Sequence, residues 1–304
     1  MMTFLIITLS CLFLNTTENN NSMDLQGKTY TISDGDMSMF DGREIKNGKI
    51  VIPEGKYLVR VKKEGDACIK VGDNTELVID GTIQLAPNSF KSYEMIRVVG
   101  SHVRIHGKGS IIGDRLKHIG HEGEWGMGIR LKGASHVTVS GITIADCWGD
   151  CIYIGGDSRS ILIKNCMLRG SRRQGISITK ADSVTISNCK IANISGTNPQ
   201  YAIDIEPNKR CVVDNVLIKN VTVTGCEGGF RAIIGKEEFG NARIGKVEVR
   251  NCHVMAKSRH TIHLAGCEKA LVRDCVIETR KGEKPILSRK VGKLSEMNNQ
   301  VVYK

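Results

Sequence analysis

The chain has 304 residues, with 43 Lys and Arg against 32 Asp and Glu, and a net charge of +11. This length suits one elongated domain or two ordinary domains, and the five prolines and the lack of a Pro-, Gly- or Ser-rich middle favour one. A basic chain attracts polyanions. Nucleic-acid modules usually cluster basic and aromatic residues, but here the charges are dispersed and aromatics make up 5%. We therefore expect no nucleic-acid partner, and an acidic polysaccharide fits better.

The N-terminal residues 1–14 are apolar, and a polar stretch follows to about Ser22. The apolar run is too short to span a bilayer as a stable helix, so we expect no integral membrane span. Although it lacks a positive start, it resembles a secretory signal peptide, and the alternative is an apolar cap over the first coil. We assign residues 1–22 to a signal peptide or apolar leader, which predicts secretion or a cell-envelope location, with a lipoprotein through Cys11 left open.

Residues 23–280 repeat one pattern, most clearly in GDCIYI at 149–154, RQGISI at 173–178 and YAIDIE at 201–206. Each copy alternates apolar and polar residues, as a strand with one buried face does, and a second short apolar strand follows. The unit recurs at roughly 22 to 32 residues, which is typical of a solenoid. We predict an all-β fold, a single right-handed parallel β-helix, with a C-terminal cap over 281–304, where the repeat is lost.

Asn-Cys or a near match follows several of the second strands, as in Asn165-Cys166, Asn188-Cys189, Asn220-Val221, Asn251-Cys252 and Asp274-Cys275. A side chain at one corner of every coil stacks on its equivalents at ~4.8 Å, where amides can hydrogen-bond to one another. The 11 cysteines are therefore expected to include a stack of small buried side chains. No CxxC pair is present, which argues against structural zinc.

Alignment of the copies predicts columns of outward side chains, because the residue after each inward isoleucine must face solvent. The first column reads Arg97, Arg130, Tyr153, Ser177, Asp204, Arg231 and His263. The column two positions later reads Lys132, Gly155, Thr179 and Glu206, and the turn before the strands carries Asp150, Gln174 and Tyr201. Together these columns predict a shallow groove with a polar and charged floor.

Four residues are predicted to be catalytic, namely Asp150, Asp204, Glu206 and Tyr201. Two coils separate Asp150 from Asp204, or ~9.6 Å along the stack, and inverting glycosidases need carboxyl groups ~6.5–9.5 Å apart. The alternative is that these outward carboxylates are only solvated. Adjacent arginines on the coil between them can bind a uronate carboxylate or a sulfate. The predicted substrate-binding residues are Arg172, Arg173, Gln174, Arg130, Tyr153, Trp125, Arg231 and His263.

A long loop at 113–126 interrupts the repeat and carries His118, His121, Glu122, Glu124 and Trp125. Loops on a solenoid often lie on its binding face, so we expect this loop to face the ligand, with a metal site as the lesser alternative. Trp125 is predicted to stack on a sugar, or else to anchor local packing. We predict no cofactor and no metal, and calcium is left open.

The coils and these columns resemble the pectin-lyase-like superfamily of β-helix carbohydrate enzymes over roughly residues 28 to 280. Within it, Gly149-Asp150-Cys151 and Gln174-Gly175-Ile176 resemble the polygalacturonase family, glycoside hydrolase family 28. That resemblance implies Asp150 as general acid, while Gln174 stands in place of the family's histidine. Tyr201-Ala202-Ile203-Asp204 resembles the motif of alginate epimerases and lyases, which implies proton transfer by Tyr201. The chain as a whole also resembles β-helix repeat proteins of gut bacteria and their phages.

The leading hypothesis is a secreted glycoside hydrolase that acts on an acidic, uronate-containing glycan, with Asp150 as acid and Asp204 or Glu206 as base. The first alternative is a lyase or C5-epimerase that uses Tyr201 with Arg172 or Arg173. The second is a non-catalytic glycan-binding or tailspike-like protein. The sequence does not decide between monomer and trimer.

Overall fold

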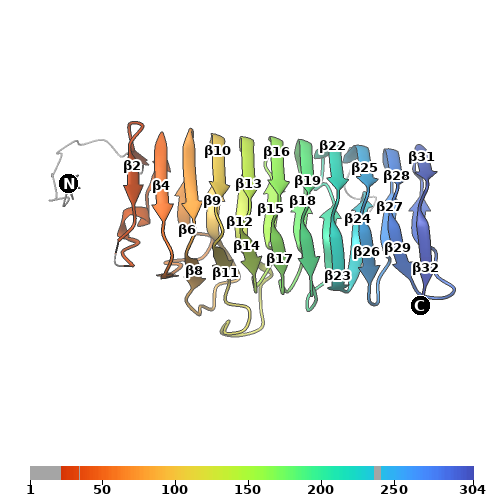
Figure 1. Cartoon of the computed structure of the whole chain (residues 1–304), viewed down its shortest axis with the longest axis horizontal. Helices are drawn as coiled ribbons and strands as arrows, with labels where there is room; N and C mark the ends of the chain where they lie inside the picture. The colour runs from red at the N-terminus through yellow and green to blue at the C-terminus, as the bar shows by residue number, and fades with distance from the viewer. Residues whose placement is uncertain (1–21, 34, 236–240) are drawn as a thin grey trace, which may run out of the picture.

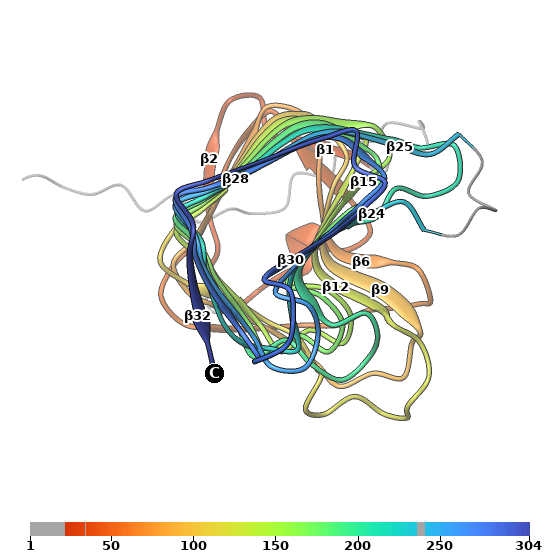
Figure 2. The same cartoon turned by 90° about the vertical axis from the view of Figure 1, so that its right-hand side faces the viewer.

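A computed structural model describes residues 22–33, 35–235 and 241–304. Three parallel sheets run the length of the molecule, and successive strands step from one sheet to the next, so that each turn of the chain forms one coil (Figures 1 and 2). Within the described residues the one helical element is the 3₁₀ turn η1 (Ser38–Phe40). The predicted all-β parallel β-helix is confirmed. Of the predicted leader over residues 1–22, residues 1–21, which include Cys11, lie outside the described residues. The last one, Ser22, begins the first described strand.

The first sheet has 11 strands. They are β1 (Ser22–Asp24), β3 (Glu44–Lys46), β6 (Ala67–Val71), β9 (Ser92–Val98), β12 (Trp125–Lys132), β15 (Ile152–Gly155), β18 (Ile176–Ile178), β21 (Tyr201–Ile205), β24 (Gly228–Ile233), β27 (Ile262–Ala265) and β30 (Ile286–Arg289).

The second sheet also has 11 strands. They are β2 (Thr29–Thr31), β4 (Gly48–Ile52), β7 (Thr75–Ile79), β10 (Ser101–His106), β13 (Ser135–Ser140), β16 (Ser158–Lys164), β19 (Ala181–Ser187), β22 (Val212–Lys219), β25 (Arg243–Arg250), β28 (Cys267–Arg273) and β31 (Lys293–Met297).

The third sheet has ten strands. They are β5 (Lys56–Val59), β8 (Thr82–Leu85), β11 (Ser110–Ile112), β14 (Thr143–Ala145), β17 (Met167–Arg169), β20 (Lys190–Ala192), β23 (Thr222–Cys226), β26 (His253–Ala256), β29 (Val276–Thr279) and β32 (Gln300–Tyr303).

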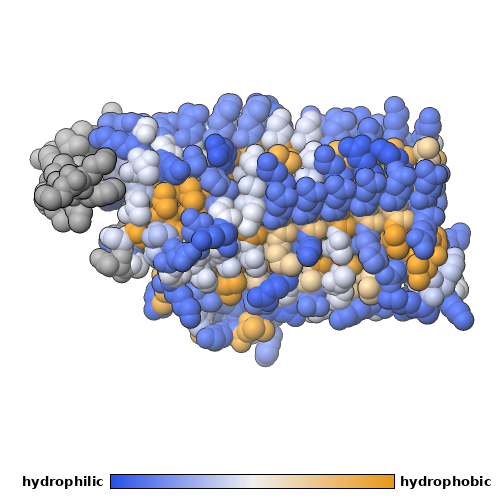
Figure 3. Space-filling model, viewed as in Figure 1, coloured by the Kyte–Doolittle hydropathy of each residue, from blue (hydrophilic) through white to orange (hydrophobic). Residues whose placement is uncertain are grey.

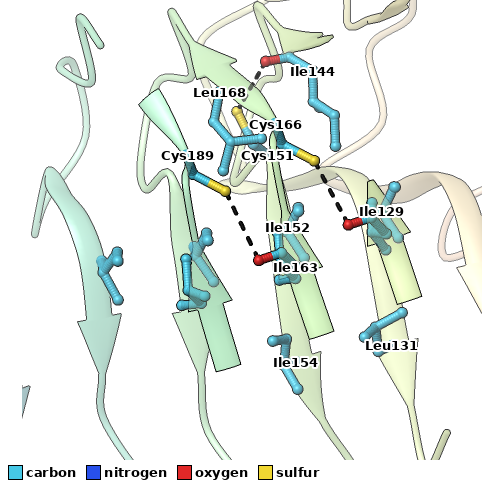
Figure 4. Close-up of a cluster of buried hydrophobic side chains, with 14 of the residues drawn as sticks. Ile129, Leu131, Ile144, Cys151, Ile152, Ile154, Ile163, Cys166, Leu168 and Cys189 are labelled. Atoms are coloured by element: carbon cyan, nitrogen blue, oxygen red, sulfur yellow. Dashed lines mark hydrogen bonds between the residues drawn. The ribbon is translucent and has the colours of Figure 1, made fainter. Parts of the chain in front are cut away.

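The core is a set of apolar columns inside the coils. Ile129, Ile152, Ile176 and Ile203 pair in register across β12, β15, β18 and β21, and all four are fully buried. Figure 4 shows part of this column with the side chains that pack against it. Because side chains alternate along each strand, this inward register fixes the outward register, and the predicted column from Arg97 to His263 is paired as expected.

The Asn-Cys corner also forms as predicted. Asn188 and Asn220 both have left-handed backbone, with φ of 53°, a conformation that asparagine tolerates better than most residues. The Asn220 amide donates to Oδ1 of Asn188 at 2.9 Å, so the corner residues hydrogen-bond between coils. The face seen in Figure 3 carries hydrophilic residues in a row along the stack, beside a band of more apolar ones.

The cysteines of this corner are buried thiols. Cys166, Cys189, Cys252 and Cys275 are each 1–3% exposed, and none is in a disulfide. Cys189 Sγ lies 3.9 Å from the carbonyl oxygen of Ile163 (Figure 4), so the thiol is a weak donor within the stack. The expected stack of small buried side chains is therefore confirmed for these four residues.

The repeat continues beyond residue 280, where the sequence predicted that it is lost. Strands β30, β31 and β32 pair in parallel with β27, β28 and β29, so most of the segment assigned to a C-terminal cap is one more coil. The apolar side chains of this coil are less buried than those of the coils before it, and Leu287 and Val301 are half-buried. Among the described residues, no helix is long and apolar enough to cross a membrane.

Candidate functional site

A pocket of about 330 Å³ lies on the outer face of the first sheet, over β15, β18 and β21. It is lined by Trp125, Tyr153, Arg173, Ser177, Thr179, Asp204, Glu206, Pro207 and Asn208. The segment 113–124, which joins β11 to β12, projects beside this sheet when the coils are viewed along their axis (Figure 2). The outward columns therefore do form the floor of a hollow, with a loop at its edge.

Asp204 lies at the centre of this floor and is 3% exposed. Its Oδ2 accepts hydrogen bonds from Gln174 Nε2 at 2.7 Å and from Arg231 Nη1 at 3.3 Å. Its Oδ1 is buried without a hydrogen-bond partner among the described residues. Burial raises the pKa of Asp204 to about 7. The positive charge of Arg231 and, to a smaller extent, that of Arg173 act in the opposite direction and lower this pKa. Asp204 is thus a carboxyl group that can hold a proton near neutral pH.

Glu206 lies two positions after Asp204, so both side chains project from the same face, and their Cα positions are ~6.6 Å apart along the strand direction. Arg231 lies between the two carboxyl groups and donates from Nη2 to Glu206 Oε1 at 3.1 Å. Glu206 is half-buried and lines the pocket, as Asp204 does. The pocket therefore presents two neighbouring carboxyl groups in different surroundings, one desolvated and one open to solvent.

Asp150 is fully buried and does not line the pocket. Arg173 Nη1 lies 3.2 and 3.1 Å from its two carboxylate oxygens, and Ser177 Oγ donates to Oδ2 at 2.7 Å. Burial raises the pKa of Asp150, and Arg173 and Ser177 oppose this effect. Because Asp150 reaches across to the coil of Ser177, the ~9.6 Å expected from two strand spacings does not describe its carboxylate. Asp150 holds Arg173 in place beneath the pocket.

Gln174 and Tyr201 were expected to contact substrate, but the structure buries both. Gln174 is fully buried, and its Oε1 accepts the backbone N–H of Tyr201 at 2.8 Å while its amide donates to Asp204. Tyr201 is 4% exposed, and the Arg231 guanidinium lies 5.5 Å from its ring centroid. Neither residue lines the pocket. The predicted contact of these two residues with substrate therefore stays a prediction, and in this structure both pack beneath the floor of the pocket.

Arg172 is directed into the 113–124 loop instead of the pocket, against prediction. Its guanidinium lies 3.7 Å from the Trp148 ring centroid and donates to the carbonyl oxygens of Gly123 and His121. It is absent from the pocket lining, whereas Arg173 lines it. Both arginines lie in the bend between β17 and β18, outside any strand, so strand alternation does not fix the direction of either side chain.

The loop histidine His118 is also structural. Its Nδ1 lies 2.8 Å from Asp114 Oδ2, and its ring stacks on Trp148 at 4.0 Å. Tyr93 donates a hydrogen bond to the same carboxylate at 2.5 Å. No three His, Cys, Asp or Glu residues come close enough together to hold a metal in the part of the chain that the structure describes. His118 thus packs the loop against β9.

The remaining predicted binding residues lie along the groove. Trp125 is half-exposed and lines the pocket, as Tyr153 does, and the Tyr153 hydroxyl lies 2.8 Å from Thr179 Oγ1. The Arg130 guanidinium lies 5.1 Å from the Tyr153 ring centroid. His263 is one coil beyond Arg231 and outside the pocket lining. Burial, followed by His260, lowers its pKa to about 4.

Several residues of the site were not among the predicted site residues. Ser177 and Thr179 belong to the outward columns, so the sequence held a signal for them. Pro207, Asn208 and Glu124 lie in turns, where strand alternation predicts no side-chain direction. Glu124 Oε2 lies 3.3 Å from Arg173 Nε, so this loop residue is part of the charge arrangement of the site.

The family described as right handed beta helix region matches residues 89–244 and 127–283. The chain belongs to this family. The handedness predicted from the sequence is thereby confirmed for this β-helix protein.

Curated relatives cover about half of the chain. The protein is 34% identical over 202 residues to uncharacterized protein YclG of Bacillus subtilis, which is 55% of this chain and 34% of YclG. It is 28% identical over 187 residues to the SPbeta prophage-derived uncharacterized protein YorA of the same organism, which is 54% of this chain and 32% of YorA. The chain therefore spans about a third of the length of these relatives.

Solved structures of similar fold include proteins named for carbohydrate chemistry. The A-module of an Azotobacter vinelandii mannuronan C-5 epimerase has a TM-score of 0.59 at 14% identity, over 83% of this chain and 67% of that one. An endo-xylogalacturonan hydrolase of Aspergillus tubingensis has a TM-score of 0.56 at 13% identity, over 84% and 85%. A tailspike of an E. coli bacteriophage, in complex with a pentasaccharide, has a TM-score of 0.51 at 13% identity, over 84% and 57%. At these identities the likeness shows the fold.

Proposed function

We propose that this β-helix protein hydrolyses a polysaccharide laid across the outer face of β15, β18 and β21. The observation that carries the proposal is the pair Asp204 and Glu206, two carboxyl groups that line one pocket and share Arg231. Hydrolysis of a glycosidic bond needs one carboxyl group that gives a proton and one that accepts a proton. A pocket that makes one carboxyl group desolvated and leaves the other solvated supplies both.

Asp204 is the proton donor in this proposal. Both hydrogen bonds at Asp204 end on Oδ2, so the acidic proton is placed on Oδ1, which has no partner among the described residues. Its pKa of about 7 leaves the carboxyl group partly protonated at neutral pH, as a general acid requires. The general acid in this proposal is therefore Asp204, and not Asp150, as the polygalacturonase resemblance implied.

Glu206 is the base that activates water. Its backbone position lies ~6.6 Å from that of Asp204 along the strand, a spacing nearer to the ~6.5–9.5 Å carboxyl separation of inverting glycosidases than to the ~5–5.5 Å of retaining ones. Arg231 donates to both carboxyl groups and fixes their relative position. We therefore propose hydrolysis with inversion at the anomeric carbon.

The elimination or epimerisation alternative depends on Tyr201, whose ring is buried and outside the pocket lining. It stays a prediction that this geometry does not favour. Secretion also stays a prediction, and it agrees with a polysaccharide substrate, which is met outside the cell. The non-catalytic alternative is an outcome of the experiment that follows.

The proposal is tested on a panel of pectins, alginate, glycosaminoglycans and neutral glycans. Reducing ends and ultraviolet absorbance are measured together, because elimination creates an unsaturated sugar and hydrolysis does not. We expect reducing ends without absorbance, and loss of reducing-end release in Asp204→Asn. Binding without cleavage of any glycan would establish the non-catalytic alternative and overturn the proposal.

A further inference from the structure

We infer that the groove takes an uncharged stretch of glycan in place of the uronate that the basic composition and the paired arginines suggested. This inference deepens the proposed function and depends on the same groove. It starts from the arginines of the first sheet, since these are the groups that would bind a ligand carboxylate.

Each arginine of the outward columns, and Arg173 in the turn before β18, already has a carboxylate partner. Arg97 and Arg130 both pair with Glu94, a residue that is 1% exposed, and the Arg130 pair measures 2.6 Å. Further along, Arg173 pairs with Asp150, and Arg231 pairs with both Glu206 and Asp204. Four arginines therefore meet their anions inside the protein.

A buried ion pair does not readily exchange its partner for a ligand, because the abandoned carboxylate would stay desolvated and unpaired. Asp150 shows this most clearly, since it is fully buried and holds Arg173 through both carboxylate oxygens. Glu124 approaches the same guanidinium from the loop at 3.3 Å. A uronate carboxylate entering the pocket would meet Arg173 only in competition with two resident anions.

The charge of the pocket itself is also unfavourable for an anion. Among its lining residues, Arg173 is the cation and Asp204 and Glu206 are the acids. The other lining groups are neutral hydroxyls, an amide at Asn208 and the rings of Trp125 and Tyr153. Carboxylates and amides bind sugar hydroxyls, and aromatic rings pack on the apolar side of a sugar.

The net charge of +11 has little effect on the electrostatic potential inside this pocket. Exposed charges more than ~8–10 Å away are largely screened at physiological salt, and the nearest histidine of the column, His263, has a lowered pKa and is neutral at pH 7. The basic composition therefore does not identify the ligand of this groove.

The test uses pairs of polymers that differ only at the carboxyl group. Polygalacturonate, alginate and hyaluronan are each compared with their carboxyl-reduced forms, and binding is measured at low and high salt for the wild type. We expect each reduced polymer to bind at least as tightly as its parent, with little dependence on salt. A preference for the uronate form in any pair, weakened by salt, would overturn the inference.

Two variants keep the test decisive if no wild-type binding is detected. Glu124→Gln and Asp150→Asn each remove one anion from Arg173, and a guanidinium freed in this way should gain about tenfold or more in affinity for the uronate polymers. Glu122→Gln is the matched control. Glu122 lies on the same loop as Glu124, but it pairs with Lys91 and does not line the pocket. No gain in Glu124→Gln, which is partly exposed and not expected to disturb folding, would contradict the inference.

These outcomes separate the inference from the proposed function. If reduced polymers bind but none is cut, the hydrolase proposal fails and the inference about charge stands. If glycans are cut in a manner that depends on Asp204 but uronate forms are preferred, the inference alone fails.

Discussion

Gln174 donates a hydrogen bond of 2.7 Å to Oδ2 of Asp204, from one coil to the next. Its other amide atom, Oε1, accepts the backbone N–H of Tyr201, which fixes the amide orientation. Gln174 must therefore present its N–H₂ group to Asp204, and it occupies one carboxyl oxygen in every protonation state. This contact leaves Oδ1 as the atom that can carry and deliver a proton.

Substitution of either pocket carboxyl group should remove activity while the fold stays intact. Asp204→Asn removes the general acid, and we expect kcat to fall by about 10²–10⁴-fold. Glu206→Gln removes the base, with a loss of similar size. Both are measured as reducing-end release, with far-ultraviolet circular dichroism as the check on folding. Retention of full activity in either variant would exclude that residue from catalysis.

The activity should decline as pH rises through about 7. The pKa of Asp204 is raised to about 7 because the carboxyl group is buried, and only its protonated form donates. The measurement is a profile of kcat/KM against pH, which reports the free enzyme. A profile that stays flat from pH 6 to pH 9 would contradict the assignment of Asp204.

The same carboxyl group should lower stability as pH increases from about 4 to about 7. Its pKa in the folded state, about 7, lies above the ordinary value of 3.8, so over this range the unfolded chain ionises first and binds fewer protons than the folded one. The free energy of unfolding then falls with pH. The wild type should lose stability relative to Asp204→Asn across this range, measured by urea unfolding at several pH values. An unchanging difference would show that Asp204 does not titrate there.

Gln174→Met should move the alkaline limit of activity upward and weaken the fold. Removal of the amide donor takes a hydrogen bond from the ionised form of Asp204, which raises its pKa further. It also leaves the Tyr201 N–H unpaired in a buried place, at a cost of about 1–3 kcal/mol. Thermal unfolding and the pH profile are measured together. Lower stability with an unmoved profile would mean that Gln174 supports the backbone only.

Sequence periodicity predicted the fold and the outward columns because both follow from the alternation of side chains. Ile152, Ile176 and Ile203 define the inward column, so Tyr153, Ser177 and Asp204 had to face out, and they do. Alternation does not say how far an outward side chain reaches. Asp150 was expected on the groove surface, but it folds beneath Arg173 and Ser177.

The direction of side chains in turns and loops also could not be predicted from the sequence. Arg172 and Arg173 are adjacent and chemically alike, yet one packs on Trp148 and the other lines the pocket. Some of their different partners, Gly123 for Arg172 and Glu124 for Arg173, come from the 113–124 loop, which is not part of the repeat. A count of arginines in the sequence also does not reveal the buried Glu94 and Asp150 that pair with them.

The corner ladder offers a test of the fold that is independent of function. Asn220 has a φ of 53° and donates to Asn188. Asn220→Gly removes the hydrogen bond but keeps an easy left-handed backbone, whereas Asn220→Ala removes the hydrogen bond and adds steric strain of about 1–2 kcal/mol. We therefore expect stability to decrease from wild type to Gly to Ala, as measured by chemical unfolding. An alanine variant as stable as the glycine variant would contradict the role given to this backbone conformation.

The central claim is that Asp204 and Glu206 act together on a glycosidic bond, and it is tested most directly by the anomeric form of the first product. Proton nuclear magnetic resonance spectra, recorded during cleavage of a bound glycan, should show the anomer opposite in configuration to the bond that was cut, and no such signal with the double variant Asp204→Asn, Glu206→Gln. Retained configuration, an unsaturated product, or cleavage that survives in the double variant would contradict the account.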